Sequence, residues 1–147
     1  MKQSFGARPR AWASAAVFLC ACSASQESSS NSDANVSFAA TPFGDAASTS
    51  GAFNVTMYAA QSGLVQGLNT IEIAVTDAQG APVDGLVLSL TPWMPAMGHG
   101  SSAIPQIVAK GSGEYVATDV ALIMPGLWQL RTQLDAQEQA VVSITLP

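Results

Sequence analysis

The feature that most constrains the fold of this chain is a repeated alternation of apolar and polar residues. In the stretch 69–76, Ile71, Ile73 and Val75 fall on one face of an extended chain, and polar residues such as Glu72 fall on the other. No segment has the 3.6-residue period of a convincing amphipathic helix. The alternation therefore predicts about seven strands, at residues 53–58, 69–76, 83–91, 104–109, 115–123, 127–134 and 140–146.

Turn signals separate these predicted strands. Between the second and third strands, Gly80 can take a positive φ angle, and Pro82 cannot donate a hydrogen bond to a central ladder. Short strands joined by Gly and Pro turns are typical of an antiparallel β-sandwich. We therefore predict an all-β fold of immunoglobulin-like topology, with Trp128 in its core and the Tyr115 hydroxyl pinning a corner of the sandwich.

The first residues have the composition of an export signal. Three basic residues precede a short apolar run at 11–19, which is too short to span a bilayer as a mature helix. The following residues, Leu19-Cys20-Ala21-Cys22, resemble the lipobox of bacterial lipoproteins, in which the second cysteine receives the lipid. The resemblance implies a signal peptide at 1–21 and a mature protein that begins at a lipid-bearing Cys22.

This anchor predicts a location on the periplasmic side of the cell envelope, with the membrane as a partner through the lipid. Ser23 stands where a signal for retention in the inner membrane usually has Asp, so the resemblance favours the outer membrane. The alternative is an ordinary secretory signal cut near Ala24.

Composition divides the mature chain into a tether and one domain. Residues 22–51 are rich in Ser, Ala, Asn and Asp and offer little to bury, so we expect a flexible tether. Residues 52–147 then form a single domain without a disulfide, because Cys20 leaves with the signal. Ten acidic residues face only Lys110 and Arg131 in the mature chain, a net charge of −8 that excludes nucleic acid as a partner.

The segment from Trp93 to Gly100 predicts a site for a soft metal ion. Met94, Met97 and His99 offer two thioethers and one imidazole, and this donor set suits Cu(I) better than Zn²⁺, Mg²⁺ or Ca²⁺. Residues 94 and 97 of a straight strand would point to opposite faces, so convergence requires the backbone to curl at Pro95 and Gly98. Trp93 could cover the ion through a cation–π contact, and Met124 is a candidate fourth donor if its loop lies at the same end.

A second interpretation of these residues involves no metal. Methionines and a tryptophan after a strand commonly plug the open end of a sandwich core, and methionine fills irregular gaps well. In that case His99 caps the backbone of its own loop through a ring N–H. The domain is then a structural or interaction module that presents its loops or an edge strand to an envelope protein.

Three groups of residues between about 69 and 134 resemble the YtkA-like family, which overlaps with the FixH-like family. They are Pro92-Trp93-Met94-Pro95-Ala96-Met97-Gly98-His99, Gly113-Glu114-Tyr115 and Met124-Pro125-Gly126-Leu127-Trp128. The resemblance implies an extracytoplasmic β-sandwich that is often anchored to a membrane. It also implies a link to metal efflux or to the assembly of copper-containing oxidases, although the chain lacks the transmembrane helix of a FixH protein.

The sequence offers little for catalysis. Ser101 and Ser102 lie near His99 in a Gly/Ser loop, where such neighbours are too common to indicate a catalytic triad. Neither a Gly-x-Ser-x-Gly motif nor a phosphate-binding loop is present. We therefore expect a protein that is not an enzyme and has no evident small-molecule substrate.

Overall fold

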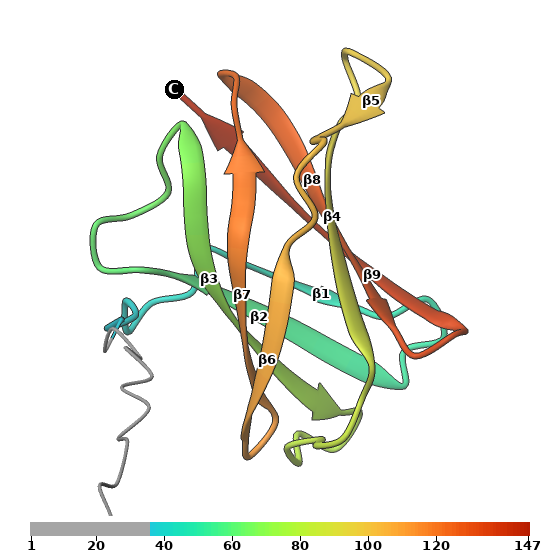
Figure 1. Cartoon of the computed structure of the whole chain (residues 1–147). Coiled ribbons are helices and arrows are strands. Elements are labelled where there is room, and N and C mark those ends of the chain that lie inside the picture. The colour runs from blue at the N-terminus through green and yellow to red at the C-terminus, as the bar shows by residue number, and fades with distance from the viewer. Residues whose placement is uncertain (1–35) are drawn as a thin grey trace, which may run out of the picture. The chain divides into compact units, whose positions relative to one another are not determined.

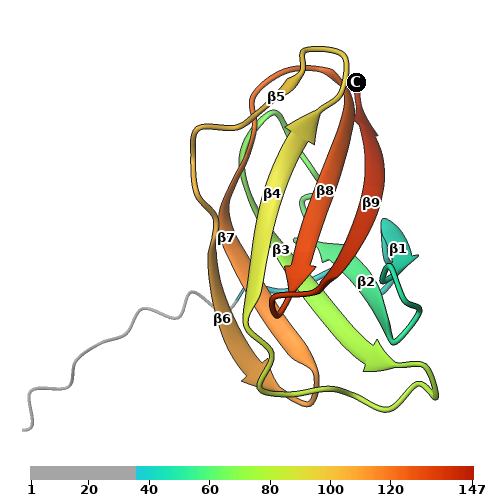
Figure 2. The same cartoon turned by 90° about the vertical axis from the view of Figure 1, so that its right-hand side faces the viewer.

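The computed structural model describes residues 36–147, which form two antiparallel sheets packed face to face (Figures 1 and 2). The predicted signal peptide at 1–21 and the predicted lipid site at Cys22 lie outside these residues. The described part has nine strands: β1 (Gly44–Ala47), β2 (Phe53–Ala59), β3 (Gly67–Asp77), β4 (Leu88–Met94), β5 (His99–Gly100), β6 (Gln106–Gly111), β7 (Glu114–Leu122), β8 (Gly126–Leu134) and β9 (Glu138–Leu146). From residue 36 onward, no helix is long and apolar enough to cross a membrane.

The order of the strands identifies the topology. One sheet has the order β1-β2-β3-β7-β6 and the other has the order β5-β4-β8-β9. Without β1, these are the A-B-E-D and C′-C-F-G sheets of an immunoglobulin-like sandwich. The predicted all-β, immunoglobulin-like fold class is therefore confirmed, with two strands more than the sequence predicted, β1 and the very short β5.

Strand β4 extends past Pro92, although the sequence analysis predicted that this strand would end at residue 91. The strand covers residues 88–94 instead of the predicted 83–91. Alternate burial along it places Leu90, Pro92 and Met94 inside the sandwich. The Pro92 carbonyl accepts a hydrogen bond from the Ser101 backbone N–H at 3.2 Å, on the side away from β8. Since N–H and C=O groups of one strand residue point to the same side, the missing N–H of Pro92 costs no hydrogen bond to β8.

Backbone pairing with the sheet begins within the segment that we predicted to be a flexible tether. The Ala39 N–H donates to the Ala59 carbonyl at 2.9 Å, beside a bridge between Phe38 and Ala60, so that prediction requires correction from residue 38 onward. Strand β1 pairs with β2, and Gly44 packs directly on the Val142 side chain of β9, which leaves no room for a Cβ atom. Beyond the strand, the Thr49 N–H donates to the Gln139 carbonyl at 2.9 Å. The segment therefore closes one side of the sandwich, by backbone bonds and a small residue that its polar composition does not reveal.

The core lies between the sheets and is filled by the inward residues of each strand. Trp128 and Tyr115 are among its largest buried side chains, as predicted. The Trp128 Nε1 donates to the Met124 carbonyl at 2.9 Å, which fixes the turn that leads into β8. The Tyr115 hydroxyl donates to the Val83 carbonyl at 3.0 Å and accepts from the Leu86 N–H at 3.2 Å. Tyr115 thus pins the connection between β3 and β4.

Candidate functional site

The Met/His segment forms a hairpin at the end of the sandwich, at the top of Figure 1. Strand β4 ends at Met94 and β5 begins at His99, and these two residues are paired in the register. The turn between them folds back tightly, because the Met97 and Gly98 N–H groups both donate to the Met94 carbonyl at 3.1 Å. Gly98 has a φ of +68°, a conformation that glycine adopts at little cost. The backbone therefore curls as the sequence analysis required.

The hairpin separates its donors between the core and the solvent. Met94 is only 4% exposed and belongs to the hydrophobic core, whereas Met97 is 55% exposed in the turn. His99 is also exposed, although its pairing with Met94 places both side chains on the same face of the hairpin. Met97 and His99 are therefore the two donors that an ion could reach without any change in the core.

The imidazole of His99 is oriented by its own loop. Its Nδ1 lies 3.1 Å from the Gly100 carbonyl oxygen. A carbonyl oxygen can only accept, so Nδ1 carries the proton in this hydrogen bond, and the Nε2 lone pair of the neutral ring remains for a ligand. Metal-binding histidines commonly donate their second ring N–H to a backbone carbonyl in this way. The same contact also satisfies the prediction that His99 caps its loop.

Met124 lies at the same end of the sandwich as the hairpin. It precedes β8, is partly buried and packs against the core. The terminal methyl of Met94 reaches the start of β8, because it would lie 3.5 Å from a Cβ atom built on Gly126. The condition for Met124 as a fourth donor, a loop at the same end, is therefore met.

Trp93 points to the other face of the sheet. Successive strand residues alternate between faces, so Trp93 projects outward from β4 while Met94 projects into the core. The guanidinium of Arg131, on β8, lies over the Trp93 ring with 4.6 Å between its Cζ atom and the ring centroid. The Arg131 guanidinium therefore already occupies this face of the Trp93 ring. The sequence analysis missed the contact, because only the pairing of β4 with β8 brings residues 93 and 131 together.

The segments around the hairpin contain no charged side chain, although the chain as a whole is acidic. Residues 59–68, 94–105 and 121–127 meet at this end of the strands and include no Asp, Glu, Lys or Arg. We call these three segments the apolar end. His99 is its only titratable side chain. Within the described residues, no group of three or more His, Cys, Asp and Glu side chains could hold a metal ion, so a metal at this end would depend on thioethers.

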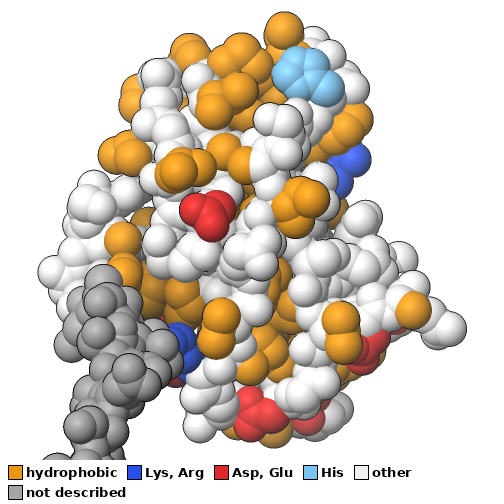
Figure 3. Space-filling view, viewed as in Figure 1, with side chains coloured by type: hydrophobic (Ala, Val, Ile, Leu, Met, Phe, Trp, Pro, Cys, Tyr) orange, Lys and Arg blue, Asp and Glu red, His pale blue; other side chains and the backbone are white. Residues whose placement is uncertain are grey.

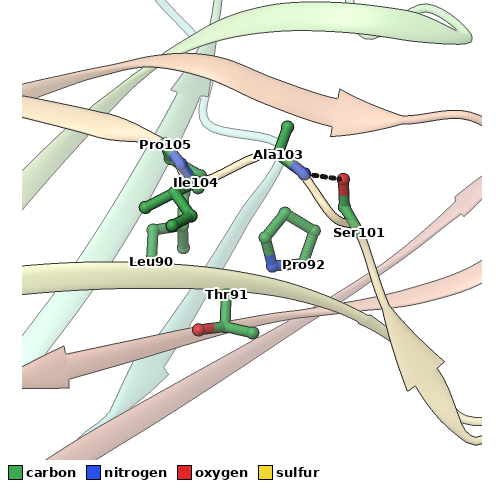
Figure 4. Close-up of a pocket in the computed structure, with 7 residues that line it drawn as sticks. All are labelled: Leu90, Thr91, Pro92, Ser101, Ala103, Ile104 and Pro105. Carbon is green, nitrogen blue, oxygen red and sulfur yellow. Dashed lines mark hydrogen bonds between the residues drawn. The ribbon is translucent and has the colours of Figure 1, made fainter.

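A small pocket lies beside the hairpin, where the chain leaves β5 and crosses toward β6 (Figure 4). Its volume of about 110 Å³ is below the roughly 300 Å³ at which ordinary small-molecule sites begin. On one side, the Ser101 Oγ accepts from the Ala103 N–H at 3.2 Å. The pocket is lined by Leu90, Thr91, Pro92, Ser101, Ala103, Ile104 and Pro105.

Fold and site together define a small immunoglobulin-like β-sandwich with a methionine/histidine hairpin at one end. Comparison with known families then identifies it: the chain belongs to the YtkA-like family, whose model matches residues 46–133, more than half of the chain. The predicted family is thus confirmed. The matched range begins within β1, before the boundary that the sequence analysis drew at residue 52. No curated protein and no solved structure matches the chain.

Proposed function

We propose that this domain binds copper(I) at the β4–β5 hairpin and hands it on, as a lipid-anchored protein on the periplasmic side of the envelope. The observation that carries the proposal is the exposed pair of Met97 and His99, with the His99 Nδ1 bonded to a backbone carbonyl. A thioether and a neutral imidazole are soft and borderline donors, which favour Cu(I) over harder cations.

The remaining ligand positions fall to residues deeper in the hairpin. Met94 and Met124 lie on the core side of this end, and either sulfur could join the ion after a rotation of its flexible side chain. Trp93 has no ligand role in this proposal, because Arg131 covers its ring and its side chain lies on the other face of β4.

A competition titration tests the copper site. The purified protein is titrated with Cu(I) against a chromogenic chelator, together with the double variant Met97→Ala/His99→Ala and the control Val87→Ala, whose side chain is 76% exposed elsewhere. We expect the double variant to lose at least tenfold in affinity, since it removes both exposed donors, and the control to match the wild type. An unchanged affinity in the double variant would refute the site.

The proposed anchor has its own test. Cys22→Ala should lose the lipid and leave uncleaved precursor or protein in the soluble fraction, whereas Cys20→Ala should change neither. Mass spectrometry of the purified N-terminus, showing Cys22 unmodified or cleavage at another residue, would overturn the assignment.

A second candidate function is a non-catalytic structural or interaction module of an envelope complex, for efflux or oxidase assembly. The burial of Met94 favours it, because this side chain is 4% exposed and packs within the hydrophobic core. The two candidates differ in what they require of Met97. The copper site needs its thioether as a ligand, whereas a packing role does not need this side chain. Neither assigns a catalytic step to the domain.

A further inference from the structure

The charged side chains of the domain are unevenly distributed along the strands. Five carboxylates lie where β3, β7, β8 and β9 begin or end away from the hairpin, or in the connections there; they are Asp77, Asp84, Glu114, Asp135 and Glu138. The apolar end has none. Pro147 also lies at the hairpin end, where its carbonyl oxygen accepts from the Gln66 Nε2 at 3.3 Å. The side chains of the acidic end would therefore repel an anionic partner, whereas those of the apolar end would not.

The apolar end also holds most of the large hydrophobic side chains that the described residues expose. Six of the ten lie there: Val65 (49%), Leu68 (65%), Met97 (55%), Ile104 (79%), Ile123 (58%) and Leu127 (47%). Figure 3 shows apolar side chains gathered over this end with the histidine among them, while the acidic groups lie lower on the same face. Grouped exposed apolar residues are typical of surfaces that bind another protein.

An ion at this hairpin would keep its full charge. Thioether and imidazole ligands are neutral, and the apolar end supplies no carboxylate side chain to compensate the charge. An acceptor with an anionic thiolate would therefore gain electrostatically on taking the ion. Thiolates are also stronger ligands for Cu(I) than thioethers, since they are soft and charged. The charge of the loaded site and that of such an acceptor are complementary.

We infer that the apolar end is the docking surface for an acceptor protein with an exposed thiolate site, to which the domain passes its copper. The inference rests on the proposed function and names its partner class. In the docked complex, Leu68 and Ile123 contact the acceptor and hold its thiolates near Met97 and His99. Copper remains Cu(I) throughout. Its bonds to the thioether and the imidazole break as bonds to the thiolate sulfurs form, and any acceptor cysteine that begins as the thiol releases its proton to solvent.

The experiment measures transfer from the Cu(I)-loaded protein to two probes. The first is a small protein domain with an exposed Cys-x-x-Cys site, and the second is a small chromogenic Cu(I) chelator that needs no docking surface. The test variant is Leu68→Gln/Ile123→Gln, which removes exposed apolar side chains without adding charge. The matched control is Val87→Gln/Val141→Gln, which does the same outside the apolar end. Urea unfolding verifies that each variant is folded.

We expect the test variant to bind Cu(I) with unchanged affinity and to pass it to the chelator at the wild-type rate. Transfer to the Cys-x-x-Cys domain should slow by roughly tenfold, because the apolar contact area of the encounter is lost. The control variant should transfer to both probes as the wild type does. Equal transfer to the Cys-x-x-Cys domain from the test and control variants would overturn the inference while leaving the copper site intact. A wild-type protein that binds no Cu(I) would overturn both.

Discussion

Alanine substitutions at Met94 and Met97 should have very different effects on stability, although both residues belong to one short motif. Met94 is 4% exposed and its methyl group lies against the start of β8, whereas Met97 is 55% exposed. A buried Met→Ala change costs about 2–5 kcal/mol through lost burial and the cavity left behind. Because Met94 lies at the end of the core, where neighbours can close in, we expect about 2–3 kcal/mol. For Met97→Ala we expect less than about 1 kcal/mol.

Equilibrium unfolding in urea, with the metal-free protein, measures both values. For a domain of this size the urea dependence is about 1–3 kcal/mol per M, so Met94→Ala should lower the unfolding midpoint by on the order of 1 M. Met97→Ala should leave the midpoint nearly unchanged. Equal losses for the two variants, or a loss below about 1 kcal/mol for Met94→Ala, would contradict the division of the motif into a core residue and a surface residue.

Three further substitutions test the packing of the sandwich. Tyr115→Phe should cost about 1–3 kcal/mol in thermal or urea unfolding, since its hydroxyl bonds two backbone groups of the β3–β4 connection. Thr132→Val should raise the free energy of unfolding by about 1 kcal/mol, because in the described part of the chain the buried Thr132 Oγ1 has no hydrogen-bond partner; a destabilised variant would contradict this. Burial, and then the nearby carboxylate of Glu114, raise the pKa of Glu72 above its ordinary value. The folded state therefore binds this proton more tightly, and its stabilising effect is present at acidic pH and lost as pH rises through the raised pKa. Glu72→Gln should be more stable than the wild type at pH 7, with the difference disappearing at acidic pH in unfolding measured as a function of pH.

Most of the fold follows from local pattern. The period-two alternation located the long strands, because each strand has buried apolar side chains on one face and more exposed, largely polar side chains on the other. The alternation could not reveal β1, whose place depends on Gly44 fitting against Val142 of a distant strand. It also placed the end of β4 before Pro92, since sequence does not show which side of a strand a proline faces.

The sequence could predict which residues make up the site, but not how deeply each of them is buried. Residue types and spacing located the hairpin and its donors, and the glycine at position 98 indicated the turn. Spacing alone could not show that Met94 is inside the core while Met97 is outside, because this depends on where the strand stops relative to the end of the sandwich. The Arg131 contact with Trp93 likewise depends on strand pairing across 38 positions of sequence, which no local pattern encodes.

The concentration of carboxylate side chains at one end of the domain affects how the domain orients in an electric field. A domain with more acidic side chains at one end than at the other has an electric dipole along its strands, and a dipole turns in an external field. Near an anionic surface, such as a leaflet rich in acidic lipids, the acidic end is pushed away and the hairpin turns toward the surface. This torque weakens with salt, because ions screen the field over about 10 Å at 0.1 M. The direction in which the hairpin points is thus set by side chains at the opposite end of the domain.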